Sequence, residues 1–237
     1  MLTRLAYPCR KAKGSCAYEW AVVLLIVNAV VAGLFALSYF LIARISRGQR
    51  PVIAFGVSYL LGMVTPISEI AIRLTDYPAP FMLASYMALL GGFLAMAAAL
   101  SIFHRKRPPW TAIATLAVLG LITRIAIWGG TRDDLIYELA FQLPLALGIL
   151  LCSHTAFRTG KGQLNHTLAG LFLLSGLNFF IKPFVAAALG SGQTARDYAG
   201  SAYALYSQAS TAILLTAAGL TVLLIVIQTT IQEYVRT

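Results

Sequence analysis

The chain has 237 residues, of which 59% are hydrophobic and 11% are charged, and its mean hydropathy is +0.79. An ordinary soluble domain carries roughly 25% charged residues, so this composition excludes a soluble globular protein and indicates an integral membrane protein. The formal net charge of +10 does not indicate a nucleic-acid partner, because the cations are scattered among loops and form no basic stripe interleaved with aromatic residues.

Seven apolar segments follow one another along the chain, each close to the roughly 20 residues that an α-helix needs to cross a bilayer. They are continuous apolar runs, whereas strands of a transmembrane barrel alternate over about ten residues, so helices are predicted. The expected fold is therefore an all-α bundle of seven transmembrane helices that occupies residues 20–229. The predicted spans are 21–43, 52–72, 80–103, 110–129, 135–157, 167–189 and 199–228.

Residues 1–19 precede the first span and are predicted to form an N-terminal tail. The apolar run after the tail is longer than the roughly 7 to 15 residues of a signal-peptide core and lacks a convincing cleavage site, so it is taken as a helix. Two of the three cysteines, Cys9 and Cys16, lie in the tail, where they form a disulfide or stay unpaired according to the compartment. Cys152 falls within the fifth predicted span.

Basic residues are unequally divided between the two sets of loops. Because Lys and Arg of short loops concentrate on the cytoplasmic side, the more basic set is predicted to face the cytoplasm. The N-terminus is then outside and the C-terminus cytoplasmic, although the cations of the tail, taken alone, favour the reverse. The odd loops contain Arg44, Arg47, Arg50, Arg105, Lys106, Arg107, Arg158 and Lys161, and the even loops contain Arg73, Arg132 and Arg196.

Several charged and amide side chains fall inside the predicted spans, where a charge costs at least about 2.5 to 3.5 kcal/mol near the bilayer centre on insertion scales. Spacings of four residues place pairs of them on one helix face. With the N-terminus outside, all of them lie in the outer half of the bundle, which predicts a ligand-binding layer there. The candidate residues are Glu69, Arg73, Arg124, Glu138, Gln142, Asn178 and Lys182.

Three cations against two carboxylates leave one positive charge if all are ionised, so the expected ligand is a small anionic or zwitterionic molecule that enters from outside. Aromatic side chains near the same surface are predicted to line the mouth of the pocket. They are Tyr77, Tyr86, Trp128, Tyr137, Tyr198 and Tyr203.

A second interpretation of the same residues stays open. Lys182 lies seven residues before the end of its predicted span, roughly 10 Å, so its long side chain is able to reach the headgroups. Arg73 and Arg124 can do the same, and the aromatic residues can form an interfacial belt. Pro183 favours a pocket, because it frees the backbone carbonyl of Phe179 and such kinks open space beside a helix.

The sequence contains no motif for catalysis, a cofactor or a metal. It lacks a glycine-rich phosphate loop, Ser-x-x-Lys and HExxH, and its histidines His104, His154 and His166 are isolated at helix ends. A retinal protein is disfavoured, because microbial rhodopsins carry their lysine in the seventh helix, and the seventh span here has none.

No proline interrupts residues 198–235, which would reach roughly 57 Å as one helix and therefore extend beyond the membrane. Residues 230–237 are predicted to begin a cytoplasmic connector helix. The candidates for signal transmission are Pro183, Gln228 and Glu233.

The second half of the chain resembles the amino-terminal multi-helix sensor region of bacterial diguanylate cyclases, and the first half resembles it in general layout. The resemblance is carried by LAGLFLLSGLNFFIKPFVAAALG, DYAGSAYALYSQASTAILLTAAGLTVLLIVIQ and TTIQEYVRT. In such proteins the last helix runs into a cytoplasmic GGDEF domain. These 237 residues contain no GGDEF motif, no DxLTGLxNR-like motif and no GTP site, so no catalytic residue is carried over.

The resemblance implies a multi-pass protein of the bacterial inner membrane that senses a small ligand and has no catalytic site in these residues. It implies a homodimer, because two GTP-loaded GGDEF domains must face each other to make cyclic di-GMP, and a cytoplasmic GGDEF domain in the same parent chain. No cofactor is implied, and the bilayer is the other expected partner.

The alternative function is a small-solute transporter or channel, for which a polar layer and kinks at Pro66, Pro144 and Pro183 are also expected. Transporters usually show two corresponding halves, and no internal symmetry is found here. A membrane-embedded enzyme would need a nucleophile or a metal cluster, and the sequence shows neither.

Overall fold

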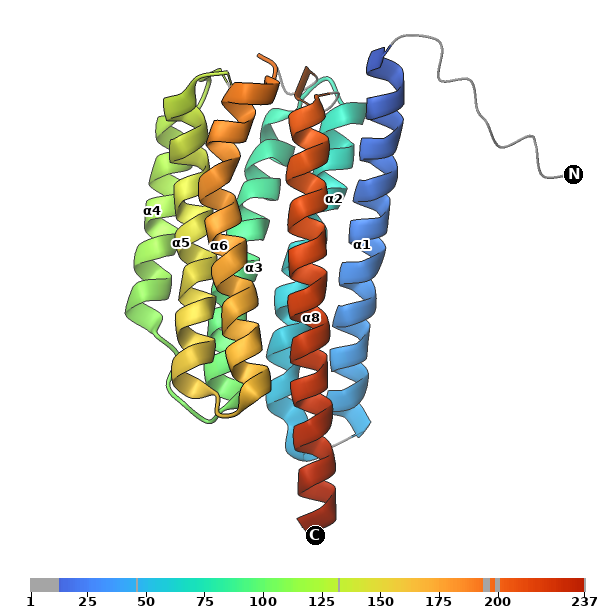
Figure 1. The fold of residues 1–237 in the computed structure, drawn as a ribbon, viewed down its shortest axis with the longest axis vertical. Helices are drawn as coiled ribbons and strands as arrows, with labels where there is room; N and C mark the ends of the chain where they lie inside the picture. The colour runs from blue at the N-terminus through green and yellow to red at the C-terminus, as the bar shows by residue number, and fades with distance from the viewer. Residues whose placement is uncertain (1–12, 46, 132, 194–196, 199–200, 237) are drawn as a thin grey trace, which may run out of the picture.

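The computed structural model of the chain describes residues 13–45, 47–131, 133–193, 197–198 and 201–236. These residues form long helices that stand side by side, nearly parallel to the longest axis of the molecule (Figure 1). The elements are α1 (Lys13–Ile45), the 3₁₀ helix η1 (Arg47–Val52), α2 (Ile53–Leu74), α3 (Ala79–Phe103), α4 (Trp110–Ala126), α5 (Leu135–Thr159), α6 (Gln163–Leu189) and α8 (Ala202–Arg236).

The all-α prediction is confirmed for the described residues, and six of their helices are long and apolar enough to cross a membrane. The fourth predicted span is shorter than expected, since α4 has 17 residues and ends at Ala126. Gly129, three residues later, takes a positive φ of 83°, a conformation that cannot continue a helix. The described residues therefore form six helices of membrane length and one shorter apolar helix, where seven spans were predicted.

Helix α1 begins at Lys13, inside the predicted tail, although its part that is apolar enough to cross a membrane begins at Glu19. At the other end α8 is one helix of 35 residues that reaches Arg236, in agreement with the uninterrupted pattern of the sequence there. Cys9 lies outside the described residues, as do Arg132 and Arg196, and the side chain of Cys16 is not described, so the pairing of Cys9 with Cys16 stays a prediction.

Adjacent helices run in opposite directions, so the loops alternate between the two ends of the bundle (Figure 1). The basic loops, after α1, α3 and α5, lie at the end from which α8 projects beyond its neighbours. The assignment of this end to the cytoplasm stays a prediction from the distribution of Lys and Arg.

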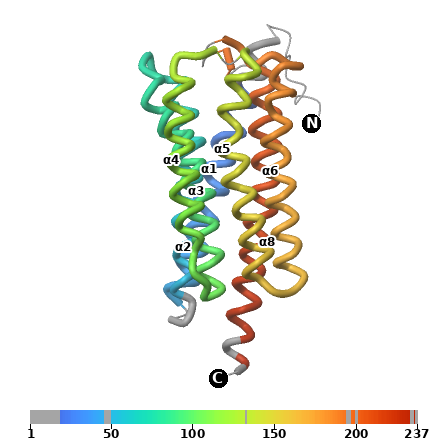
Figure 2. Tube along the Cα trace, turned by 90° about the vertical axis from the view of Figure 1, so that its left-hand side faces the viewer, coloured from blue at the N-terminus to red at the C-terminus, as the bar shows by residue number. Residues whose placement is uncertain are grey.

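Six of the helices form a ring, in which contacts run in the order α1, α2, α3, α5, α6 and α8, and α8 returns to α1. Tyr39 of α1 helps to close the ring by donating a hydrogen bond to the carbonyl of Gly219 in α8 at 3.0 Å. Helix α4 stands outside the ring, against α3 and α5, as two views at right angles show (Figures 1 and 2). Arg124 of α4 is nevertheless buried, and its charge acts on Tyr86 of α3.

Helices α2 and α3 approach closely because Gly92 has no side chain. A Cβ atom at this position would lie 3.3 Å from the carbonyl oxygen of Ser58, and the Ser58 hydroxyl donates to the carbonyl of Gly92 at 2.7 Å. Small residues and interhelical hydrogen bonds of this kind are what hold helices together in lipid, where apolar burial provides little driving force between helices.

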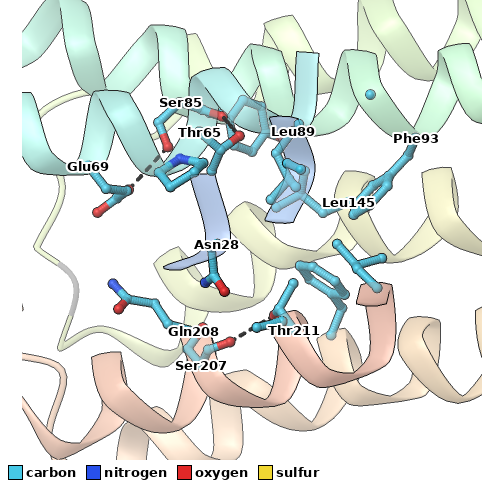
Figure 3. A pocket seen from close by; sticks show the side chains of 18 of the residues that line it. Asn28, Thr65, Glu69, Ser85, Leu89, Phe93, Leu145, Ser207, Gln208 and Thr211 are labelled. Carbon is cyan, nitrogen blue, oxygen red and sulfur yellow. Dashed lines mark hydrogen bonds between the residues drawn. The ribbon is translucent and has the colours of Figure 1, made fainter. Parts of the chain in front are cut away.

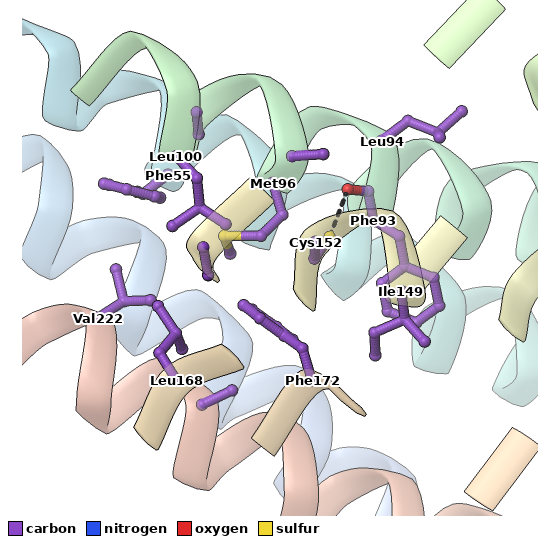
Figure 4. Packing of buried hydrophobic residues seen from close by; sticks show 14 of the residues in the cluster. Phe55, Phe93, Leu94, Met96, Leu100, Ile149, Cys152, Leu168, Phe172 and Val222 are labelled. Carbon is purple, nitrogen blue, oxygen red and sulfur yellow. Dashed lines mark hydrogen bonds between the residues drawn. The ribbon is translucent and has the colours of Figure 1, made fainter. Parts of the chain in front are cut away.

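The interior of the ring differs between its two ends. The half away from the projecting end of α8 contains a cavity with polar lining (Figure 3), whereas large apolar side chains fill the other half (Figure 4). Cys152 belongs to this apolar cluster, where its thiol donates to the carbonyl of Phe93 at 3.1 Å. The cluster includes Phe55, Met96, Leu100, Ile149, Leu168, Phe172 and Val222.

We expect Gly176→Leu to destabilise the bundle by about 1 to 3 kcal/mol, because overpacking a well-packed interface costs this much. A Cβ atom at Gly176 of α6 would lie 2.6 Å from the side chain of Leu150 in α5. Thermal unfolding of the purified protein in detergent measures the effect. The matched control is Gly170→Leu on the same helix, where a Cβ atom meets nothing within 4 Å; equal melting temperatures for the two variants would contradict the packing.

Candidate functional site

The cavity at the centre of the ring has a volume of about 210 Å³. One water molecule needs roughly 10 to 15 Å³ by the same measure, so the cavity has room for a small organic molecule. Each of the six ring helices contributes side chains to its wall, and among the described residues no side chain of α4 does. The site is thus formed by segments from nearly the whole length of the chain.

Lys182 of α6 points to the interior and is only 3% exposed. Its Nζ atom donates to Thr211 Oγ1 of α8 at 2.6 Å and lies 4.1 Å from the centroid of the Phe179 ring. The carboxylate of Glu138 in α5 also interacts with it electrostatically. The alternative in which Lys182 reaches the headgroups is therefore wrong, and the lysine belongs to the cavity wall.

Glu138 is 2% exposed and links α5 to α8. Its Oε2 atom accepts hydrogen bonds from the hydroxyl of Tyr203 at 3.3 Å and from Gln142 Nε2 at 3.4 Å. Gln142 Nε2 also approaches the Tyr203 hydroxyl at 3.3 Å. All three side chains line the cavity, so a hydrogen-bonded carboxylate belongs to the same wall as the Lys182 ammonium.

Asn178, one turn before Lys182 on α6, also contacts α8. Its Nδ2 atom donates to Ser210 Oγ at 3.2 Å, and its Oδ1 atom accepts from the hydroxyl of Tyr206 at 3.3 Å. Asn178 is not part of the cavity wall. These contacts and those of the two preceding paragraphs form what we call the α8 network, which consists of Glu138, Gln142, Asn178, Lys182, Tyr203, Tyr206, Ser210 and Thr211.

Two of the predicted cations lie outside the cavity wall. The guanidinium of Arg73 donates to the carbonyl of Glu69 in its own helix at 3.0 Å. Arg124 is 2% exposed, but it lies on α4, outside the ring, with its guanidinium carbon 5.1 Å from the centroid of the Trp128 ring. The predicted excess of positive charge therefore does not hold for the cavity, whose acidic and basic lining residues are Glu69, Glu138 and Lys182.

Glu69 enters the cavity wall from α2. Its Oε1 atom accepts a hydrogen bond from the hydroxyl of Ser85 in α3 at 3.1 Å. Figure 3 shows Glu69 on one side of the cavity, with Asn28 of α1 and Gln208 of α8 on the other. The site thus has one carboxylate beside Lys182 and a second one on a different wall.

Polar atoms in the cavity wall lack hydrogen-bond partners among the described residues. They are the hydroxyl of Tyr86, Oε1 of Gln142, and both amide atoms of Gln208, and each of these atoms is buried. A buried polar atom without a partner costs about 1 to 3 kcal/mol, so these atoms indicate that the cavity receives a polar occupant.

Three of the six aromatic residues that were predicted to line the mouth of the pocket belong to the cavity wall. Tyr86, Tyr198 and Tyr203 line the cavity, whereas Tyr77 and Trp128 are exposed on the surface, and Tyr137 is buried but not part of the wall. Several lining residues were not among the candidates, because small hydroxyl and amide groups are common in apolar helices. For Ser207 and Thr211 the signal was their recurrence at intervals of four residues after Tyr203. The missed residues are Asn28, Thr65, Ser85, Ser207, Gln208 and Thr211.

The candidates for signal transmission lie on α6 and α8. Pro183 is buried next to Lys182, and α6 continues through it as one helix to Leu189. Gln228 is exposed on α8, and the side chain of Glu233 lies outside the described residues. Their role stays a prediction.

Comparison with known protein families, with characterised proteins and with solved structures finds no match for this chain. The likeness to cyclase sensor regions therefore stays a prediction from sequence, and the function is argued from the geometry of the cavity.

We expect Thr211→Val to lower the melting temperature in detergent more than the same change at Thr229. The first substitution removes the acceptor of Lys182 Nζ and leaves a buried ammonium with one partner fewer, a loss of about 1.5 to 3 kcal/mol for a bond to a charged group. Thr229 is the matched control on the same helix, because its hydroxyl bonds within α8 to the carbonyl of Ile225. Equal changes in melting temperature for the two substitutions would show that the hydrogen bond between Thr211 and Lys182 does not stabilise the folded protein.

Proposed function

We propose that the protein is a membrane-embedded sensor, in which a small ligand in the central cavity changes the position of α8. In this proposal α8 passes the change to a cytoplasmic diguanylate cyclase domain of the same parent protein in the bacterial inner membrane. The observation that carries the proposal is that the polar contacts of the cavity converge on α8, the helix that projects from the bundle (Figure 1).

The α8 network gives a ligand a means of acting on this helix. Lys182 reaches α8 at Thr211, and Glu138 reaches it at Tyr203. A polar ligand competes for these same donors and acceptors, and its affinity then differs between arrangements of α8 that keep or break the contacts. A ligand shifts a conformational equilibrium only through such a difference in affinity.

The shape of α8 supports transmission over a distance. The lining residues of α8 fall between Tyr203 and Thr216, in the first half of the helix, and the same helix continues to Arg236. A continuous helix of 35 residues spans about 52 Å, so a rotation or a shift at the cavity reaches the projecting end. The distribution of basic loops supports placing that end in the cytoplasm, with the cavity half toward the outside.

A small-solute transporter is the alternative use of the same cavity. The apolar side chains that fill the other half of the ring, among them Leu100, Leu168 and Val222, favour a binding site that does not continue through the bundle (Figure 4). Uptake into proteoliposomes tests the alternative: accumulation of a solute that depends on Lys182 would favour transport over sensing.

We expect Lys182→Met to change cyclic di-GMP production at least about fivefold when a diguanylate cyclase domain is joined after Thr237, because allosteric coupling typically amounts to about 1 to 3 kcal/mol. The substitution keeps the length of the side chain but removes the ammonium that holds Thr211. Cellular cyclic di-GMP, measured by mass spectrometry at equal amounts of membrane-inserted protein, reports the change.

The matched control for this experiment is Lys161→Met, because Lys161 is exposed in the loop between α5 and α6. This variant should keep the output of the unmodified fusion. An unchanged output in the Lys182 variant, with or without added ligand, would remove the α8 network from signalling.

A further inference from the structure

We propose that a second pocket, at the end of the bundle from which α8 projects, binds a phosphate group, which an anionic phospholipid of the surrounding bilayer carries. The pocket has a volume of about 380 Å³ and lies between α3, the connection from α3 to α4, and α5. It shares no lining residue with the central cavity, so the inference goes beyond the proposed function. We call it the basic pocket, after its lining residues Lys106, Arg107, His154 and Arg158.

The way in which α3 ends brings two of these cations to the pocket. The amide of Arg105 donates to the carbonyl of Ile102 at 3.0 Å, and the amide of Lys106 donates to the carbonyl of Ser101 at 2.8 Å. This pair of bonds commonly terminates a helix at a residue in the left-handed conformation, and here Arg105 is that residue, with a φ of 56°. The turn places Lys106 beside the last turn of α3, with Arg107 directly after it, and the two prolines that follow prevent the helix from continuing.

Helix α5 provides the other basic side chains. His154 and Arg158 are four residues apart, so they lie on one face of this helix. The inner wall of the basic pocket consists of buried hydroxyl residues, Ser101 of α3 and Thr155 of α5. The Ser101 hydroxyl donates within its own helix, to the carbonyl of Ala97 at 3.2 Å. The charged donors of the pocket therefore come from two separate segments of the chain that face each other across it.

The positive charges of the basic pocket have no counter-ion among the described residues. None of its four basic side chains forms an ion pair or a side-chain hydrogen bond with another described residue, and no described acidic residue lines the pocket. The acidic residues of the loops are at the opposite end of the bundle (Figure 1). They are Asp76, Asp133, Asp134 and Asp197. An anion in the pocket therefore meets three cations without competition from a carboxylate of its wall.

The donors of the basic pocket suit a phosphate group. A guanidinium is a planar fork that bonds two phosphate oxygens at once, and an ammonium adds a compact charge with three donors. The imidazole of His154 contributes one N–H even when it is neutral. Since these donors approach from two segments, they match a tetrahedral group with oxygens in several directions better than a planar carboxylate, which one guanidinium already satisfies.

The position of the basic pocket favours a lipid as the source of the phosphate. Helices α3 and α5 are both of membrane length and end at Phe103 and Thr159, so the pocket lies where the hydrocarbon core gives way to the headgroups. Trp110 and Phe157 are 61% and 63% exposed, and each is next in sequence to a lining residue. Tryptophan concentrates at this level of a membrane, and basic pockets between transmembrane helices are typical sites for anionic headgroups.

The test titrates the complete chain in detergent with phosphatidylglycerol and, separately, with phosphatidylcholine, and native mass spectrometry counts the bound lipids. Both lipids carry a phosphate, but choline adds a cation that the basic pocket repels. We expect one phosphatidylglycerol to bind at least about tenfold more tightly than phosphatidylcholine. A third titration, followed by calorimetry, uses glycerol 1-phosphate, which has a phosphate and no acyl chains.

The double variant Arg107→Gln and Arg158→Gln should weaken the binding of phosphatidylglycerol at least about tenfold, because it removes both guanidinium groups from the basic pocket. The matched control is Arg44→Gln with Arg50→Gln, which removes the same charge at the same end of the bundle, outside the pocket, and should keep the affinity of the unmodified protein. All four arginines are exposed, so both variants are expected to fold, and thermal unfolding without added lipid checks this. Arg158→Gln alone should weaken binding severalfold.

Tight binding of phosphatidylglycerol that depends on Arg107 and Arg158, with weaker binding of glycerol 1-phosphate, assigns the site to a lipid. Equally tight binding of glycerol 1-phosphate with the same dependence would assign it to a soluble phosphate compound. Equal affinities for phosphatidylglycerol in the two double variants would overturn the inference, and so would equal binding of the two lipids without binding of glycerol 1-phosphate. These results do not depend on cyclic di-GMP output, so this site and the proposed sensor are tested separately.

Discussion

The structure depends on one constraint, that a charged side chain buried between apolar helices must find its partners inside the protein. Lys182 meets this constraint through a hydrogen bond to Thr211 and through the ring of Phe179, in the field of the Glu138 carboxylate. The bond to Thr211 joins α6 to α8, and Glu138 joins α5 to the same helix through Tyr203. The α8 network is therefore both a structural requirement of the bundle and the connection between its cavity and the helix that projects from it. A ligand that enters the cavity necessarily meets the groups that position α8.

The ring separates two kinds of interior along its axis. In one half, hydroxyl, amide and carboxyl groups surround a cavity, and in the other half apolar side chains such as Leu100, Leu168 and Val222 pack together. Close-packed protein interiors have low compressibility and resist deformation. The apolar half therefore restrains the end of the bundle from which α8 projects, while the polar half can exchange one set of hydrogen bonds for another. This division suits a device in which binding at one end is reported at the other.

The position of each charge around the ring determines which ligand the cavity suits. Arg73 and Arg124 were predicted to share a layer with Lys182, yet one engages the backbone of its own helix and the other lies on α4, outside the ring. Their absence from the wall leaves Glu69 with a neutral hydrogen-bond donor. The ionisable residues of the wall itself are Glu69, Glu138 and Lys182, while the buried guanidinium of Arg124 acts on the wall from behind, through Tyr86.

The sequence by itself determined the helical class and the positions of the apolar segments, because apolar length and spacing along one helix are local properties, although the fourth of the seven predicted spans forms a helix of only 17 residues. It also identified Glu69, Glu138, Gln142 and Lys182, since charges are rare in apolar helices and stand out. Tertiary structure decided which helices form the ring, that α4 is excluded from it, and which faces meet. It also supplied Thr211, Gln208 and Ser85, whose types are common in such helices and carry no signal alone. The physical reason is that a helix sequence specifies its own face but not the neighbour that this face contacts, and only the packed ring brings residues from six helices to one cavity.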